Sequence, residues 1–144
     1  MLNTSYLYEF IDQISENSPA RDLAGTFTDA ATEGSGALPE WKANAAAVWS
    51  LDNLELNYSI NYISSITEKV PVTDTTRKIK SWTTHDLQLS YSLPFYNGLQ
   101  MSLGIDNLFD QEPPFAAAAF NDNFDPRTYD SKGRFWYFRA TQAF

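Results

Sequence analysis

The segment LELNYSINYIS, residues 54–64, decides the fold of this chain. Its side chains alternate between two kinds along most of its length. The apolar parity consists of Leu54, Leu56, Tyr58, Ile60 and Tyr62, and the polar parity of Glu55, Asn57, Ser59 and Asn61. Successive side chains of a β-strand point to opposite faces, so the segment predicts a strand with one apolar and one polar face.

Five more segments show the same alternation less regularly, at residues 4–14, 41–51, 82–93, 99–109 and 134–144. The alanine-rich segment 41–51 would favour a helix by intrinsic propensity. Its parity favours a strand instead, because Trp41, Trp49 and Leu51 share one side with alternate alanines. The sequence therefore predicts an all-β protein with about six strands of about ten residues each.

The connections between these segments alternate in length. Asp52-Asn53 and residues 94–98 are predicted to be tight turns, whereas residues 15–40, 67–80 and 110–133 are long connections. This alternation predicts an antiparallel up-and-down meander with every short turn at one end. Bacterial outer-membrane barrels show the same asymmetry, and strands of about ten residues match a tilted bilayer crossing.

Length and composition exclude several classes of protein. The 144 residues predict one domain, residues 1–144, and the chain has no cysteine, which excludes disulfide scaffolds and thiolate metal sites. A net charge of −8 argues against binding nucleic acid. No apolar run approaches the roughly 18 residues of a transmembrane helix. The first residues lack the basic flank and apolar run of a secretory signal.

Aromatic residues on the apolar parity are candidates for the girdles of a membrane barrel. Trp41 and Trp49 are separated by eight residues, or roughly 26 Å in a strand. That separation would put one indole at each membrane interface, and we expect Tyr58 and Tyr62 to contribute to the same girdles. The alternative is that both tryptophans fill the core of a β-sandwich.

Other chemistry is scarce in the sequence. The only histidine, His85, is expected to be an interfacial side chain near a strand end. Asp122, Asp125 and Asp130 could bind Ca²⁺ through oxygen atoms, but we expect a solvated acidic loop there. No glycine-rich phosphate loop or nucleophile elbow occurs. We therefore expect no enzyme, with no catalytic residue, no metal and no cofactor.

A set of residues towards the C-terminus resembles the end of a TonB-dependent outer-membrane receptor. The set consists of Asp106, Asn107, Leu108, Phe109, Asp110, Pro113, Pro114, Gly133 and Arg134, followed by an aromatic segment that runs to Phe144. We call these nine residues the family motif. Residues 22–25 and 38–44 resemble the stretch that opens an earlier strand in the same family, so the resemblance runs from about residue 20 onwards.

The resemblance implies a barrel of roughly 22 strands that is closed by a separate plug domain. Such receptors move scarce ligands of the siderophore, cobalamin or saccharide type, driven by the partner TonB acting on the plug. No plug is recognised in this chain, so TonB would act only through the absent plug. The resemblance implies that this chain is the C-terminal section of the barrel wall in the bacterial outer membrane. Its partners would be outer-membrane lipid and the missing N-terminal barrel and plug.

Six strands are fewer than the roughly eight of the smallest single-chain outer-membrane barrel. An open sheet also leaves two unpaired edges, which lipid does not tolerate. We therefore expect a truncated gene product or a fragment of a receptor. The alternative is a subunit that closes its barrel with copies of itself.

The final segment carries Trp136, Phe138 and Phe144 on one parity. Outer-membrane barrels resemble one another in ending on an aromatic residue, which the barrel-assembly machinery recognises. The resemblance implies that these three residues form a C-terminal insertion signal, although Gln142 departs from the pattern.

Two function classes follow from these observations. The first is a section of the wall of an outer-membrane transporter. The second is a soluble all-β module that binds carbohydrate or another ligand, with Trp41, Trp49, Trp82 and Trp136 in its core or stacked on sugars. Strand length favours the first, because sandwich strands average about five or six residues.

Overall fold

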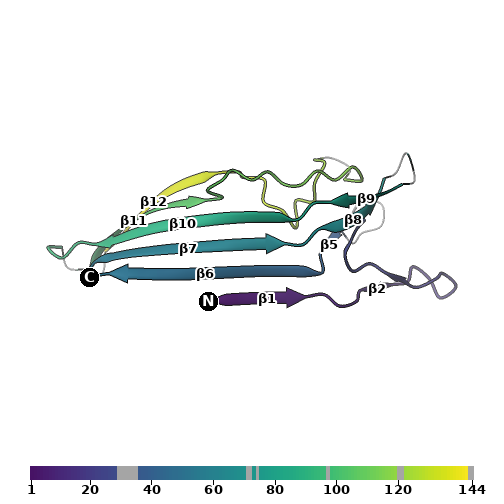
Figure 1. Ribbon diagram of the computed structural model, residues 1–144, viewed down its shortest axis with the longest axis horizontal. Coiled ribbons are helices and arrows are strands. Elements are labelled where there is room, and N and C mark those ends of the chain that lie inside the picture. Colours follow the sequence, from purple (N-terminus) through teal and green to yellow (C-terminus); the bar gives the residue numbers. More distant parts are fainter. Residues whose placement is uncertain (29–35, 71–72, 74, 97, 120–121, 143–144) are drawn as a thin grey trace.

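The computed structural model describes residues 1–28, 36–70, 73, 75–96, 98–119 and 122–142. Six strands form one antiparallel sheet in the order β1-β6-β7-β10-β11-β12, so the predicted up-and-down meander is confirmed (Figure 1). The bounds of these strands are β1 Leu2–Tyr6, β6 Trp41–Leu51, β7 Leu54–Ile63, β10 Trp82–Ser92, β11 Leu99–Asp106 and β12 Phe135–Gln142.

The short turns lie where the sequence predicts them. Leu51 pairs with Leu54 across the first hairpin, and Asp52 takes a left-handed φ of 50° between them. The second turn joins β10 to β11 and includes Gly98 at a φ of 74°. Asn97, which the prediction also placed in this turn, lies outside the described residues. Both turns are at the left end of the sheet in Figure 1.

Short strands outside the main sheet were not predicted from the sequence, and the first of them lies at the end of the predicted segment 4–14. Strand β2 (Ile11–Asp12) pairs with β3 (Arg21–Asp22). A separate four-stranded sheet has the order β5-β4-β8-β9. Its strands are β4 Thr26–Thr28, β5 Gly36–Leu38, β8 Ile66–Lys69 and β9 Thr76–Ile79. Strands of two or three residues are too short for an alternation to be recognised, and the four-residue strands show it only briefly. In the described part of the chain, no helix is long and apolar enough to cross a membrane.

Two predicted strands end earlier than expected. The segment 4–14 forms a sheet strand only to Tyr6, which pairs with Trp41. One further backbone bond, from the nitrogen of Leu7 to the carbonyl oxygen of Glu40 at 2.8 Å, follows this pair. The segment 99–109 ends at Asp106, because Asn107 takes a left-handed φ of 51°. The prediction of about ten residues for every strand is therefore wrong at both places.

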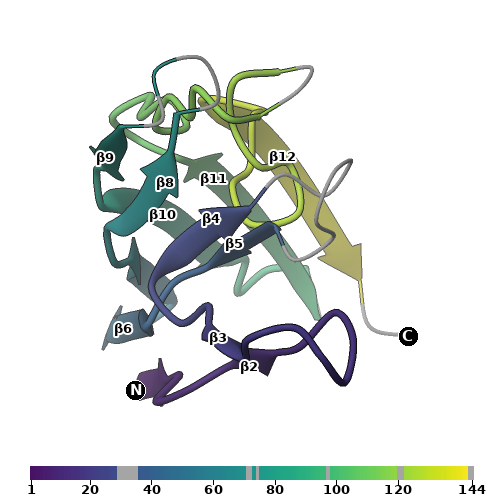
Figure 2. The ribbon, with the colours of Figure 1, turned by 90° about the vertical axis from the view of Figure 1, so that its right-hand side faces the viewer.

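The burial of side chains in the sheet is the reverse of that in a water-soluble protein. Polar side chains are buried on one face, and large apolar side chains are exposed on the other. On its concave face, the polar residues Thr84, Ser90 and Ser102 are 6, 2 and 6 % exposed. On the opposite face, Leu89 and Leu103 are 43 and 50 % exposed. We call these the inner and the outer face. Figure 2 shows the sheet curving around β4 and β5, which lie on the inner side at one end.

The buried apolar cluster lies at that same end rather than in the middle of the sheet. It consists of Phe27, Ala37, Ile63, Ile66, Ile79, Trp82, Ala116 and Tyr129. Ile63 and Trp82 are the ends of β7 and β10, and the other members come from the long connections. We call strands β4, β5, β8 and β9 together with the described residues of 107–133 the cap. It lies opposite the short turns (Figure 1).

Candidate functional site

The chain leaves the sheet after β11 at a turn that Asp86 of β10 fixes. Oδ1 of Asp86 accepts a hydrogen bond from the backbone nitrogen of Asn107 at 2.9 Å. Oδ2 accepts from the side chains of Ser59 and Asn61 at 3.1 and 2.9 Å. Asparagine tolerates the left-handed conformation better than most residues. The side-chain oxygen of Asn107 accepts from the backbone nitrogen of Gln111 at 2.8 Å, which completes the turn.

The end of the last long connection returns to this turn. Oδ1 of Asp110 accepts a hydrogen bond from the backbone nitrogen of Arg134 at 2.8 Å. Gly133 has a φ of 70°, and a Cβ atom there would lie 3.1 Å from the same oxygen. Lys132 extends its ammonium to within 3.3 Å of the Asp106 carboxylate. The two halves of the family motif, far apart in sequence, are therefore brought together.

The remaining family-motif residues lie around the same turn. The backbone nitrogen of Leu108 donates to the carbonyl oxygen of His85 at 2.7 Å, which extends the pairing with β10 by one bond. Phe109 is 64 % exposed and lies edge-on to the imidazole of His85, with ring centroids 4.9 Å apart. Pro113 and Pro114 are half-buried beyond the strand, where they cannot extend the ladder.

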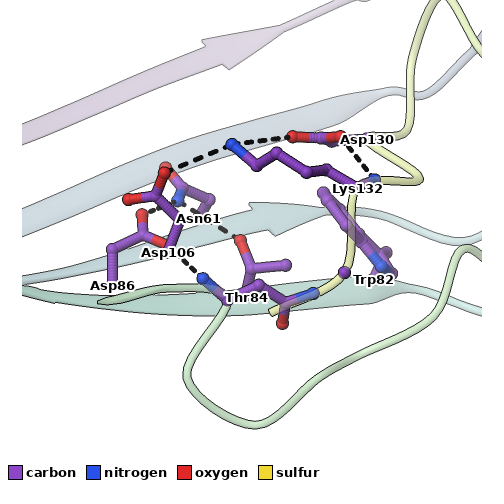
Figure 3. Close-up of a pocket in the computed structure, with 9 residues that line it drawn as sticks. Asn61, Trp82, Thr84, Asp86, Asp106, Asp130 and Lys132 are labelled. Carbon is purple, nitrogen blue, oxygen red and sulfur yellow. Dashed lines mark hydrogen bonds and ion pairs between the residues drawn. The ribbon is translucent and has the colours of Figure 1, made fainter. Parts of the chain in front are cut away.

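A cavity of about 370 Å³ lies between the inner face and the end of the last long connection (Figure 3). Asn61, Thr84 and Asp86 line it from β7 and β10, with Asp106 at the end of β11. Trp82, Asn107, Asp130, Lys132 and Gly133 complete the lining. We call this cavity the wall pocket. Its position on the inner face makes it the candidate functional site.

Three carboxylates and one ammonium group set the electrostatics of the wall pocket. Nζ of Lys132 lies 3.3 Å from Asp106 and 3.9 Å from Asp130, and Figure 3 shows it between the two. These three side chains are 44, 39 and 64 % exposed, so solvent reaches the ion pairs. Because Asp86 adds a third carboxylate, the pocket carries an excess of negative charge.

The cap above the pocket is held by a buried carboxylate on β8. Glu68 is 1 % exposed, and its oxygens accept hydrogen bonds from Nε of Arg77 at 2.7 Å and from the backbone nitrogens of Ala117 and Ala118 at 3.1 and 2.9 Å. Arg77 also donates to the carbonyl oxygen of Phe115 at 2.8 Å. Glu68 and Arg77 therefore attach the last long connection to the β8–β9 hairpin.

A second buried carboxylate attaches the same connection to β5. Asp125 is 5 % exposed and accepts hydrogen bonds from the backbone nitrogen of Ala37 at 2.8 Å and from the Thr128 hydroxyl at 3.0 Å. Burial, reinforced by the Asp125 charge, raises the pKa of Tyr129 to about 12. The ring of Tyr129 lies edge-on to Trp82 at 5.8 Å. The expectation of a solvated acidic loop is therefore wrong for Asp125.

The stretch at residues 22–25 forms a smaller anchor on the other side of the cap. Oδ1 of Asp22 accepts hydrogen bonds from the backbone nitrogens of Phe10 and Ala24, both at 3.0 Å, and these bonds lower the pKa of the carboxyl group. Leu23 is buried, and Gly25 takes a φ of 71° with the Glu40 side chain beside it.

The aromatic residues predicted for the girdles lie on β6 and β7. Trp41 and Trp49 are 46 and 53 % exposed, near opposite ends of β6. Tyr62 pairs with Ala43 near the cap end of the sheet. Tyr58 lies nearer its middle, with its hydroxyl oxygen 2.6 Å from Nδ1 of His85. Their role in a membrane girdle stays a prediction.

Two of the three residues of the predicted insertion signal lie in the part of the chain that the structure describes. Trp136 and Phe138 lie on β12 and are 58 and 65 % exposed. Phe144 lies outside the described residues. The insertion role stays a prediction for all three.

The alternative prediction of a tryptophan-filled sandwich core is wrong. Trp41, Trp49 and Trp136 each expose about half of their surface, between 46 and 58 %. Trp82 is buried at 7 %, but its partners belong to the cap rather than to a second large sheet.

Sequence reasoning missed the acidic anchors Glu68 and Asp86. Asp86 stands on the polar parity of a predicted strand, where nothing distinguishes a hydrogen-bonding hub from a solvated carboxylate. Glu68 stood in a predicted loop, and the signal that could have found it is its position within Ile66-Thr67-Glu68-Lys69, a short alternating segment. In the described part of the chain, no group of three or more histidine or acidic side chains could hold a metal ion.

A comparison with family models matches residues 2–108 to the model described as TonB dependent receptor-like, beta-barrel. Neither the curated proteins nor the solved structures give a significant match. The matched family consists of transporters rather than enzymes, and its members are located in the bacterial outer membrane. The match covers well over half of the chain and agrees with the reversed faces of the antiparallel sheet. The chain belongs to the TonB-dependent receptor β-barrel family.

Proposed function

We propose that this chain forms the C-terminal section of the wall of a TonB-dependent transporter that imports a scarce ligand of the siderophore, cobalamin or saccharide type. The observation that carries the proposal is the reversal of the two faces of the sheet. The outer face exposes large apolar side chains such as Leu89, Leu103 and Phe138, whereas the polar residues Ser90 and Ser102 are buried on the inner face. Lipid on one side and an aqueous passage on the other would satisfy both faces.

The two ends of the sheet support partners that complete the barrel. Strands β1 and β12 are terminal in the sheet order, so each presents an edge without a neighbour in the described part of the chain. Unpaired backbone groups are costly in hydrocarbon. We propose that the N-terminal barrel strands of the same receptor pair with these edges, and that TonB acts through a plug within that barrel. The barrel-assembly machinery would insert the wall into the outer membrane.

The orientation follows from the asymmetry of the two ends. Outer-membrane barrels have short periplasmic turns and long extracellular loops. The cap would therefore face the outside of the cell, and the hairpin at Asp52-Asn53 would face the periplasm.

Cysteine labelling tests this function, because the chain has no cysteine of its own. Thr75→Cys and Ser131→Cys on the cap side should react with a membrane-impermeant maleimide in intact cells. Asn53→Cys and Tyr96→Cys on the turn side should react only after the outer membrane is permeabilised. The reverse result would invert the orientation. Recovery of the chain as a soluble protein, with all four sites labelled after cell lysis alone, would refute the function.

A further inference from the structure

The wall pocket is fixed by hydrogen bonds that already occupy its nitrogen donors. Nδ2 of Asn61 donates to Asp86 at 2.9 Å and to Thr84 at 3.3 Å. The indole nitrogen of Trp82 donates to the carbonyl oxygen of Glu112 at 3.1 Å. Nζ of Lys132 lies between Asp106 and Asp130. Nδ2 of Asn107, which also lines the pocket, donates to the carbonyl oxygen of Gln111 at 3.0 Å. Each side-chain nitrogen that lines the pocket in the described residues therefore has a partner within the protein.

The oxygen acceptors of the pocket are not used to the same extent. An ionised carboxylate can accept about four hydrogen bonds. Among the described residues, Asp106 has a single polar contact, from Lys132 to Oδ2. Oδ1 of Asp130 accepts a hydrogen bond from the backbone nitrogen of Lys132 at 2.8 Å, and Oδ2 forms only an ion pair with the ammonium of the same lysine at 3.9 Å. The side chain of Asp130 remains 64 % exposed. The pocket therefore offers free carboxylate lone pairs and few free donors.

The charge of the pocket also favours ligands that donate hydrogen bonds over anionic ligands. Three carboxylates face one ammonium group in the pocket, and the whole chain carries a net charge of −8. An anionic ligand would meet repulsion from the carboxylates, and the one ammonium group that could attract it is already paired with two of them. A ligand that supplies hydroxyl or ammonium donors would meet acceptors with unused capacity.

We infer that the wall pocket is a binding subsite for a small ligand that presents clustered hydrogen-bond donors and carries no negative charge. The inference rests on the proposed function, because it takes the inner face as the lining of a transport path. The volume of about 370 Å³ is at the lower end of small-molecule sites. It would take part of a ligand such as one or two sugar rings or a polyamine segment. In the absence of a ligand, the ammonium of Lys132 takes the position of such a donor beside Asp106 and Asp130.

The test uses outer-membrane vesicles from the source bacterium, with vesicles from a strain lacking the gene as the blank. Three isotopically labelled probes are compared by equilibrium dialysis: maltotriose as a neutral polyol, spermidine as a cation and trigalacturonate as an anion. Maltotriose, spermidine or both should bind at least tenfold more tightly than trigalacturonate. Asp106→Asn and Asp130→Asn should each weaken that binding by roughly tenfold, because a hydrogen bond to a charged acceptor becomes one to a neutral amide oxygen.

Two further variants sharpen the result. Asp122→Asn makes the same change of charge at an exposed position that does not line the pocket, and should leave binding unchanged. Lys132→Met frees both carboxylates, and should strengthen the binding of spermidine but not that of maltotriose. This variant therefore distinguishes a cationic from a neutral ligand.

The inference is overturned if trigalacturonate binds as tightly as the other probes, if neither aspartate variant weakens binding, or if none of the three probes binds saturably. The cysteine-labelling pattern is measured in the same cells. A correct labelling pattern without donor-selective binding would refute this subsite and leave the transporter function intact. A wrong labelling pattern would refute the transporter function itself.

Discussion

The sheet and the cap of this protein follow opposite rules of burial within one chain. In the sheet, polar residues such as Ser90 and Ser102 are buried, and apolar residues such as Leu103 are exposed. In the cap, Ile66 and Ile79 are each 1 % exposed, as they would be in the core of a water-soluble domain. The difference indicates that each region is adapted to a different solvent. The boundary between them crosses β7 and β10 near Ile63 and Trp82, where the apolar cluster of the cap begins on the inner face.

The largest expected effect is a loss of stability of the cap alone, caused by substitution of Glu68. Glu68→Ala removes a buried acceptor from Arg77 and from the backbone nitrogens of Ala117 and Ala118. Each backbone donor that is left without an acceptor costs about 1–3 kcal/mol. The lost ion pair adds less, because the Arg77 side chain is 40 % exposed. When intact cells are treated with trypsin, we expect the variant protein to be cleaved at Arg127 far faster than the wild type. The heat-modifiable mobility of the barrel on gels should be retained.

The control for this variant is Glu112→Ala, which removes an exposed carboxylate from the same connection. It should leave the cleavage rate unchanged. Equal loss of cap and barrel in Glu68→Ala would show that the two regions do not fold separately.

The next largest effect is the difference in stability between an arginine on the outer face and an arginine on the inner face, at the same depth in the membrane. Leu87 lies at the centre of β10 on the outer parity, and Asn57 lies on the inner parity of β7, paired with Gln88. An arginine on a lipid-facing position near the bilayer midplane costs about 2–4 kcal/mol, and far less in the lumen. Leu87→Arg should therefore lower the denaturant midpoint of the barrel much more than Asn57→Arg. Equal losses in the two variants would contradict the assignment of the faces.

A smaller effect is a loss of cap stability at alkaline pH, caused by ionisation of Tyr129. The pKa of Tyr129 is about 12 in the folded protein against 10.0 for the free side chain. The folded state therefore holds this proton more tightly than the unfolded state does. Stability is fully retained below pH 10 and is lost as the pH rises towards 12, by at most about 3 kcal/mol, since one pKa unit corresponds to about 1.4 kcal/mol.

Difference titration at the tyrosinate absorption band measures this effect. Tyr129→Phe should remove a component that titrates near pH 12 and should flatten the alkaline loss of cap stability. Tyr96→Phe, at an exposed turn, is the matched control. A wild-type titration that shows Tyr129 ionising near 10 would contradict the burial of its hydroxyl.

The smallest effect concerns packing on the inner face of the sheet. A Cβ atom on Gly104 would lie 2.1 Å from Cζ of Tyr137, the paired residue on β12. Gly104→Ala must push the ring aside and break the bond from its hydroxyl to Gln88, which measures 2.9 Å. We expect a loss of about 1–2 kcal/mol by overpacking. The double variant Gly104→Ala with Tyr137→Ala should be no less stable than Tyr137→Ala alone if this clash is the cause.

The regions also differ in how far the sequence predicts them. Periodicity identified the strands at 41–51, 54–64 and 82–93 to within about one residue at each end, because a long strand between lipid and water must alternate. The cap has no such constraint, since its strands are short and its contacts join distant parts of the chain. The family resemblance found the motif turn at Asp106 and Asn107. Nothing in the local sequence could show that Asp86 holds it, because that contact depends on the register of neighbouring strands.

The hydrogen bond between Asp125 and Ala37 has a consequence for the order in which the protein is made. The two residues are 88 positions apart, and β6, β7, β10 and β11 lie between them. Contacts that span so much chain form late, because the intervening segments must first be ordered. A partly assembled wall would therefore leave Phe27, Ile66 and Ile79 uncovered until residue 125 arrives. During that interval these apolar side chains would be open to proteolysis, and closure of the cap would end that exposure.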